Sequence, residues 1–192
     1  MTSHPVSRRR YVEGLSPGSA TAAWAEAWLK VLIAQDGSAT LLCETIAQGP
    51  IHLDVVHQVV TSNVPPEVRD HLSGVEFIER QVCMSFRHEV MMDNLSYIAL
   101  DAVDPELRGY LEAGISPIGH IFDRRWTRKK PVPALSSVQR RLWQRSGAPD
   151  PSAVRSYLLE MPHGACMLIT ETFRAGMRFG LPVASESAVR VD

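Results

Sequence analysis

The sequence predicts an α+β domain with an antiparallel sheet of about six strands. Most strand-like segments follow one another across short turns, which is the pattern of hairpins. The helix-like segments lie between groups of strands and do not alternate with every strand, so a parallel sheet is not expected. With 192 residues, of which 45 % are apolar, the chain is long enough to form one sizeable core.

The expected organisation is a single domain over residues 19–175. A polar, basic segment at 1–18 precedes it and is expected to be a flexible extension. Residues 176–192 follow it and are expected to be a loose tail. We expect the helices to lie largely on one side of the sheet.

The first half of the domain is expected to hold one helix and then strands. The spacing of apolar residues predicts a helix over Ser19–Ala34, followed by a turn. Strands are then predicted at Ala39–Ile46 and Ile51–Val60, joined around Gln48-Gly49-Pro50. After a polar connection, a further pair of strands is predicted at Phe77–Arg87 and Val90–Leu100.

The second half is expected to begin with helices and end with a hairpin. Asp104-Pro105-Glu106 combines a capping side chain, a proline in the first turn and an early acid, and predicts a helix that runs to Gly114. Pro117-Ile118-Gly119 opens a second short helix or tight loop. A helix is predicted at Ser136–Arg145, within an irregular basic region. The last hairpin comprises Val154–Met161 and Ala165–Phe173.

Composition and charge limit the possible partners. The formal net charge of −1 argues against nucleic-acid binding, which depends on neutralising phosphates. No apolar run approaches the roughly 20 residues that span a bilayer. The arginine cluster at 8–10 is not followed by an apolar stretch, as a secretion signal would be, so the expected location is cytoplasmic. Cys43, Cys83 and Cys166 fit reduced core thiols better than disulfides.

Two charged residues fall on strand faces that are otherwise apolar. Arg80 alternates with Ile78 and Val82, and Glu171 shares a predicted face with Ile169. A charge buried without a partner is costly, so such a position indicates either an internal ion pair or a binding cavity. One cation and one carboxylate facing a common cavity would suit a small anionic molecule with a polar tail.

Other polar residues give weaker indications. His57 shares a predicted face with Leu53 and Val55, and is either a core histidine with satisfied hydrogen bonds or a second donor to an anion. The basic run at 124–130 is interpreted as a solvated loop, as a nucleic-acid patch, or as a segment in which one or two cations steer or clamp a dianionic substrate. No histidine, cysteine or acidic motif has metal-binding spacing, and no phosphate-binding glycine loop occurs. We therefore predict no metal and no cofactor.

Five short motifs occur in an order that resembles a known family. They are Asp36-Gly37-Ser38-Ala39-Thr40 before a strand, the strand Ile51–Gln58 with its terminal pair His57-Gln58, the arginine of Ile78-Glu79-Arg80, Ser116-Pro117-Ile118-Gly119, and Leu168-Ile169-Thr170-Glu171-Thr172-Phe173. In this order, over roughly residues 32–173, the chain resembles the chorismate pyruvate-lyase family. His57 stands where that family often has a longer cation, and the basic run does not align cleanly.

The resemblance implies a fold and a reaction. The fold is a six-stranded antiparallel sheet with helical flaps over an internal ligand pocket. The reaction is the cofactor-independent elimination of pyruvate from chorismate, which gives 4-hydroxybenzoate. Arg80 would bind the ring carboxylate, helped by backbone amides near Ala39 and Ile118-Gly119. Glu171 would hydrogen-bond the ring oxygens and could act as the general acid.

Two other classes of function remain open at this stage. One is another small-molecule biosynthetic enzyme on the same fold, acting on a carboxylic acid. The other is a non-catalytic module that binds a small ligand, since the effector-binding domains of some transcription regulators share this fold. In every case the expected partner is a small anionic molecule, and the chain is expected to be a monomer or a homodimer. Fold alone does not decide between these functions.

Overall fold

The computed structural model describes residues 20–113, 117–122 and 125–178. The segment predicted as an N-terminal extension, and the tail from residue 179 onward, lie outside the described residues, as does the predicted helix end at Gly114. No helix in the described ranges is both long enough and apolar enough to cross a membrane.

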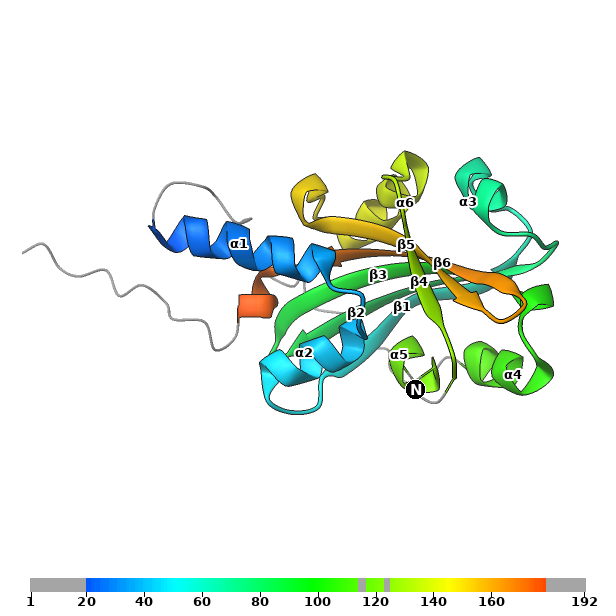
Figure 1. The fold of residues 1–192 in the computed structure, drawn as a ribbon, viewed down its shortest axis with the longest axis horizontal. Coiled ribbons are helices and arrows are strands. Elements are labelled where there is room, and N and C mark those ends of the chain that lie inside the picture. The colour runs from blue at the N-terminus through cyan, green and yellow to red at the C-terminus, as the bar shows by residue number, and fades with distance from the viewer. Residues whose placement is uncertain (1–19, 114–116, 123–124, 179–192) are drawn as a thin grey trace, which may run out of the picture.

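Six strands form one sheet, and all neighbouring strands are antiparallel (Figure 1). The strands are β1 (His52–Thr61), β2 (Phe77–Phe86), β3 (Glu89–Ala99), β4 (Arg128–Val132), β5 (Val154–Met161) and β6 (Gly164–Phe173). Their order across the sheet is β1-β2-β3-β6-β5-β4. The predicted α+β class and the antiparallel sheet are therefore confirmed. Short turns join β2 to β3 and β5 to β6, whereas the connections from β1 to β2 and from β4 to β5 contain helices.

Short helices surround the sheet. They are α1 (Ala20–Ala34), α2 (Ala39–Ala47), α3 (Pro66–His71), α4 (Pro105–Ala113), α5 (Ile118–Phe122) and α6 (Ser136–Ser146). Short 3₁₀ turns occur at η1 (Leu100–Ala102), η2 (Pro151–Ala153) and η3 (Ala175–Arg178). The predicted cap of α4 is present, since the Asp104 side chain accepts a hydrogen bond from the Leu107 amide at 2.7 Å.

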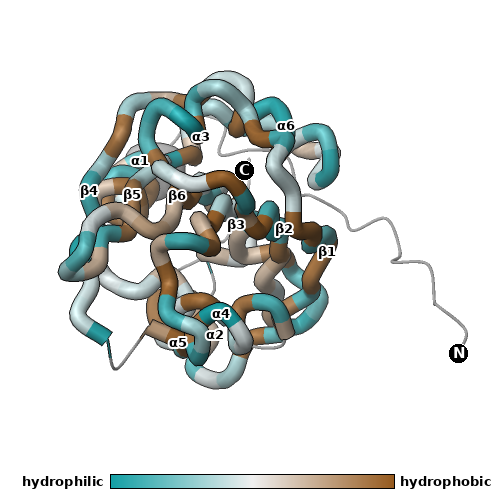
Figure 2. Tube along the Cα trace, turned by 90° about the vertical axis from the view of Figure 1, so that its right-hand side faces the viewer, coloured by the Kyte–Doolittle hydropathy of each residue, from teal (hydrophilic) through white to brown (hydrophobic). Residues whose placement is uncertain are grey.

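Both faces of the sheet are covered by helices (Figures 1 and 2). On one face α3 and α6 pack on Leu95, Tyr97 and their neighbours. On the other face α1, α2, α4 and α5 surround two further apolar clusters. The expectation that the helices would lie largely on one side is therefore wrong. The central strands β2 and β3 are buried along nearly their whole length, so both of their faces need a covering layer.

The segment Ala39–Ile46, predicted as a strand, is the helix α2. Ser38 caps it by accepting a hydrogen bond from the Leu41 amide at 3.2 Å. The buried residues Ala39, Cys43 and Ala47 recur every four positions, which is helical spacing. The motif at residues 36–40 therefore leads into a helix, and the turn at 48–50 connects that helix to β1.

Two elements were absent from the prediction. The connection with two prolines contains α3, which has a proline in its first turn. Part of the basic run forms β4, a short edge strand that pairs with β5. The sheet thus has the expected number of strands, with β4 in the place of the predicted strand at 39–46.

Candidate ligand-binding cavity

A cavity of about 670 Å³ lies on the face of the sheet covered by α1, α2, α4 and α5. Its floor comes from the strands and its walls from the start of α2, from α5 and from the chain leading into β4. The lining residues on the floor are Leu53, Arg80, Val82, Met84, Met92, Asn94, Tyr157, Leu159, Ile169 and Glu171. This volume is in the range of pockets that enclose a small organic ligand.

Arg80 is at the floor of the cavity and is fully buried, with no exposed surface. It lies in the middle of β2, opposite Gln58 on one side and Ser96 on the other. Burial lowers the pKa of Arg80 from its ordinary value. An arginine nevertheless keeps its charge at neutral pH, so the cavity has a permanent cation in its floor.

Two helix starts meet at the wall of the cavity. Ser38, Ala39 and Thr40 at the start of α2, and Ile118 and Gly119 at the start of α5, line it. The two segments approach closely at Gly119, because a Cβ atom there would lie 2.7 Å from both the Ser38 and the Thr40 hydroxyl oxygens. The absence of a side chain at this position therefore lets the two helices come together.

Glu171 is buried on the same face of the sheet and has three donors around it. Its Oε2 is 2.7 Å from Arg155 Nε, and its Oε1 is 2.8 Å from the Tyr157 hydroxyl. Asn94 Nδ2 is 3.5 Å from Oε1. Sheet register explains this arrangement, since Asn94 and Arg155 lie directly opposite Glu171 on the two neighbouring strands.

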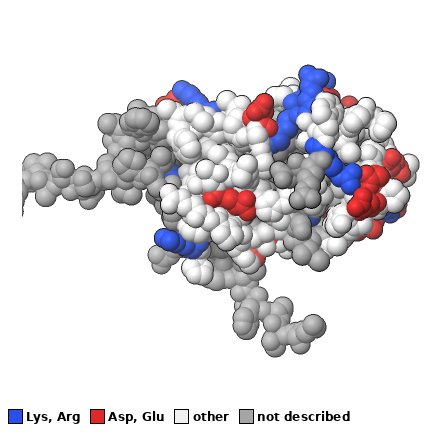
Figure 3. Space-filling view, turned by 60° about the horizontal axis from the view of Figure 1, so that its bottom comes forward, with Lys and Arg blue, Asp and Glu red and all other residues white. Residues whose placement is uncertain are grey.

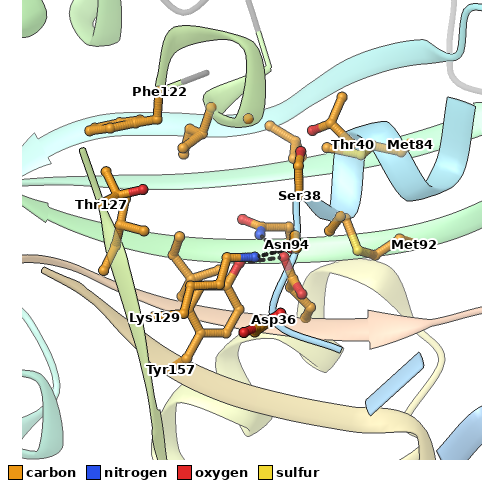
Figure 4. A pocket seen from close by; sticks show the side chains of 18 of the residues that line it. Asp36, Ser38, Thr40, Met84, Met92, Asn94, Phe122, Thr127, Lys129 and Tyr157 are labelled. Atoms are coloured by element: carbon orange, nitrogen blue, oxygen red, sulfur yellow. Dashed lines mark hydrogen bonds between the residues drawn. The ribbon is translucent and has the colours of Figure 1, made fainter. Parts of the chain in front are cut away.

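Tyr157 connects Glu171 to a lysine at the cavity wall. Burial, followed by the neighbouring Glu171 charge, raises the pKa of Tyr157 well above its ordinary value, so its hydroxyl stays a donor. Lys129 Nζ lies over the Tyr157 ring, 4.5 Å from the ring centroid (Figure 4). Burial lowers the pKa of Lys129, while the Glu171 charge opposes this shift.

The structure brings five of the predicted site residues together. Arg80, Glu171, Ala39, Ile118 and Gly119 all line the one cavity. The expected alternative for Glu171, an internal ion pair, is also present, with Arg155 as its partner. A carboxylate on an apolar face is thus both paired and open to the cavity.

His57 is not among the residues that line the cavity, and the prediction that it shares a face with Leu53 and Val55 is wrong. A β-bulge between Val55 and His57 shifts the register of β1 by one residue. His57 therefore lies opposite Gln81 on the other face, where its Nε2 is 3.6 Å from Glu79 Oε1. Gln58 takes the position opposite Arg80, and its amide donates to the backbone carbonyls of Leu111 and Glu112.

The prediction did not name Arg155, Tyr157 or Asn94, and it included Lys129 only as part of the basic run at 124–130. Arg155 and Tyr157 alternate in the strand that pairs with the Glu171 strand, which was a signal available in the sequence. In the described ranges, no group of three or more histidine, cysteine or acidic residues could hold a metal ion. On the face seen in Figure 3, which carries α2, α4 and α5, basic and acidic side chains are interspersed.

No protein-family model matches the sequence, and no curated protein has significant similarity to it. Some solved structures resemble the fold at low identity. One is the ligand-binding domain of a protein described as a GntR-family transcriptional regulator from Bordetella bronchiseptica. Its identity is 12 % and its TM-score 0.40, over 65 % of this chain and 85 % of that chain.

Two further structures have comparable values. A GntR-family transcriptional regulator from Bacillus cereus has 7 % identity and a TM-score of 0.41, over 65 % of this chain and 92 % of that chain. The C-terminal domain of the histidine utilization repressor from Pseudomonas syringae has 5 % identity and a TM-score of 0.39, over 66 % and 93 %. At these identities the likeness concerns the fold alone.

Proposed function

We propose that this chain binds a small organic acid in the cavity, with the carboxylate at Arg80 and a hydroxyl or ether oxygen at the Glu171 end. The observation that carries this proposal is the presence of a fully buried arginine and a buried glutamate on the floor of one cavity of about 670 Å³. A cation and a carboxylate in a single cavity require a ligand with different chemistry at its two ends.

The Arg80 end suits the carboxylate. A planar guanidinium can donate two parallel hydrogen bonds to a carboxylate, which fixes the orientation of the ligand as well as its charge. The start of α2, with Ala39, and the start of α5, with Ile118 and Gly119, line the same cavity. Backbone amides at helix starts are further donors for an anion.

The Glu171 end suits a hydrogen-bond donor. Arg155, Tyr157 and Asn94 all present donor groups to this carboxylate. A carboxylate surrounded by donors acts as an acceptor, so a ligand hydroxyl is the group it would hold. This favours a binding role for Glu171 over the predicted role as general acid, and it favours the non-catalytic module among the expected functions.

The test is a binding measurement with 4-hydroxybenzoate and its neutral analogue 4-hydroxybenzamide. Calorimetry on the wild type should show tighter binding of the acid. Replacement of Arg80 by methionine removes the charge, and the affinity for the acid should fall by about tenfold or more, because charge-assisted hydrogen bonds contribute roughly 1.5–3 kcal/mol. The affinity for the amide should change much less.

The matched control is Arg145→Met. Arg145 pairs with the buried Glu79 on the opposite face of the sheet, so its replacement removes a cation away from the cavity. It should leave the affinity for 4-hydroxybenzoate unchanged. Equal binding of the acid by the wild type and by Arg80→Met, or no binding by either, would contradict the proposal.

A second candidate function is chorismate pyruvate-lyase activity. It is favoured by the co-location of Arg80, Glu171 and the Ile118-Gly119 segment, which are the residues that the family resemblance assigns to substrate binding. Such an elimination forms an aromatic ring, so orientation and charge stabilisation in a dry cavity could supply most of the acceleration. Incubation with chorismate and detection of pyruvate and 4-hydroxybenzoate tests it. Chorismate binding without turnover would leave the binding function alone.

A further inference from the structure

The connector between α1 and α2 forms part of the cavity wall. Asp36, Gly37 and Ser38 all line the cavity, and Ser38 is also the cap of α2. The connector begins where α1 ends, with the Gln35 amide still bonded to the Val31 carbonyl. A change in the contacts between the connector and the rest of the cavity therefore acts directly on the C-terminal end of α1.

Arg155 links the connector to the floor of the cavity. Its Nη1 donates to the Leu32 carbonyl at 3.1 Å and also to the Gln35 carbonyl. Leu32 lies in the last turn of α1, and Gln35 directly follows the helix. The same guanidinium pairs with Glu171 through Nε at 2.7 Å. The Arg155 side chain is buried, with 8 % of its surface exposed. One buried group thus bonds to a cavity carboxylate and to a helix end.

A second cation holds the connector in a similar way. Lys129 Nζ donates to the Gly37 carbonyl while it lies over the Tyr157 ring. The Arg155 guanidinium also lies over this ring, 5.4 Å from its centroid. Tyr157 in turn donates to Glu171. The carboxylate, the tyrosine and the two cations therefore form one connected network between the cavity floor and the connector.

We propose that Arg155 is a positioning residue that couples the state of Glu171 to the C-terminal end of α1. The guanidinium has its donors in a fixed planar fork, so a shift of the Glu171 carboxylate reorients the bonds to Leu32 and Gln35. A ligand hydroxyl that donates a hydrogen bond to Glu171 changes the hold on the connector. The ligand step rests on the proposed function, whereas the coupling of Glu171 to α1 does not.

The experiment measures backbone amide hydrogen exchange of residues 30–38 in the unliganded protein. Glu171→Gln removes the charge that orients Arg155, and exchange in this segment should become about three- to tenfold faster, the effect of losing one ordinary hydrogen bond. Residues 24–28 of α1 serve as an internal reference, because Trp28 Nε1 is held separately by the Met177 carbonyl at 2.9 Å.

A double-mutant cycle assigns the effect to Arg155. In an Arg155→Met background, Glu171→Gln should no longer change exchange at residues 30–38. Arg155→Lys keeps a charge near Glu171 but cannot form the same fork. It should therefore also uncouple the two sites, and it provides the test if the methionine variant does not fold.

Asp93→Asn is the matched control. It removes the carboxylate from another buried ion pair, in which Arg174 Nε is 2.8 Å from Asp93 Oδ2. After correction for overall stability, amide exchange at residues 30–38 of this variant should match that of the wild type. The coupling would be overturned if Glu171→Gln left the exchange rate at residues 30–38 unchanged. It would also be overturned if Glu171→Gln still changed that rate in both the Arg155→Met and the Arg155→Lys backgrounds. Both outcomes are independent of ligand binding. A second arm adds 4-hydroxybenzoate, which should alter exchange at 30–38 in the wild type and not in Arg155→Lys.

Discussion

At the scale of single residues, the proposed function gives Glu171 two roles that usually belong to different side chains. Its Oε2 is occupied by Arg155, which offsets the cost of burying the charge. Its Oε1 accepts from Tyr157 and faces the cavity that Arg80 also lines. An ion pair of this kind leaves a carboxylate oriented and available, so the charge can be both structural and ligand-binding.

This dual role leads to a prediction for Glu171→Gln. Wild-type protein should bind 4-hydroxybenzoate more tightly than benzoate, because only the former has a hydroxyl group for Glu171. In the variant this preference should shrink by about tenfold, since hydrogen bonds to charged groups contribute roughly 1.5–3 kcal/mol. Calorimetric titration with both acids measures the preference. A preference that survives the substitution would place the hydroxyl elsewhere in the cavity.

Alternation along the strands placed Arg80 and Glu171, while a β-bulge in β1 defeated the same reasoning for His57. The bulge after Val55 moved His57 to the opposite face. A second irregularity, between Leu159 and Glu160, shifts the final hairpin by one position. If the strand pairing were counted back from Met161 and Gly164 without this irregularity, Arg155 would lie opposite Thr170 and not opposite Glu171. A one-residue slip reverses every side chain, and bulges have no strong sequence signal.

At the scale of elements, a buried carboxylate adds ion pairs to the apolar packing between α6 and the sheet. Glu79 of β2 is 2 % exposed and accepts from Arg141 and Arg145, both on α6. Burial alone would raise the pKa of Glu79, but the hydrogen bonds from Arg145 and Arg141 lower it below its ordinary value of 4.5. The two ion pairs of Glu79 also help to orient α6 over the central strands.

Glu79→Gln should therefore destabilise the protein. A broken buried pair costs about 3–5 kcal/mol, and the partial exposure of both arginines reduces this to about 1–3 kcal/mol. Since the folded pKa is depressed, the contribution is present above the unfolded pKa and is lost as the pH falls through the folded value. Urea unfolding at pH 7 and at pH 3 should show a large difference from wild type at pH 7 and a smaller one at pH 3. A pH-independent difference would contradict this explanation.

The contact between α2 and α5 predicts the effect of Gly119→Ala. The added methyl group would lie 2.7 Å from the Ser38 and Thr40 hydroxyl oxygens and 3.0 Å from Thr40 Cβ, so the helices must separate slightly. Overpacking of this kind costs about 1–3 kcal/mol, and the affinity for 4-hydroxybenzoate should fall with it. Thermal unfolding and calorimetry measure both. Adding Thr40→Ala should restore part of each loss.

The error over α2 shows where periodicity fails. The segment 39–46 is short and mostly apolar, so both a strand and a helix fit its pattern. The deciding feature is Ser38, whose side chain caps the first turn. Capping residues are common in turns as well, which makes the signal ambiguous before the structure is known.

At the scale of the whole molecule, the three cysteines lie in the packed interior and none forms a disulfide. Cys43, Cys83 and Cys166 are at most 2 % exposed. Burial is the main factor that raises the pKa of both Cys43 and Cys166 to about 12. Because thiolates are the reactive form, these two side chains are protected by protonation as well as by packing.

Thiol labelling should therefore report global unfolding. At pH 8 a thiol-specific disulfide reagent should modify none of the three cysteines of the folded protein within minutes, and all three in denaturant. The labelling midpoint in urea should coincide with that from circular dichroism if the domain unfolds in one step. Rapid labelling without denaturant would indicate local opening of the core.

Chain order predicted the sheet because consecutive hairpins restrict the possible topologies. The cavity was less predictable, because it depends on elements far apart in sequence. Gly119, the α1–α2 connector and Lys129 of β4 meet there only through the folded arrangement. Single residues on strand faces can be inferred from alternation, whereas the wall residues Ala39, Ile118 and Gly119 were expected only through the family resemblance.

The position of β4 gives the basic run an explanation independent of any ligand. β4 is the last strand of an open sheet, with β5 on one side. Arg128 and Lys130 are exposed on it, and Pro131 has no amide hydrogen to offer. Charge repulsion and a missing donor both discourage another strand from adding to this edge. The run at 128–131 therefore helps to keep the sheet from growing into a neighbouring molecule.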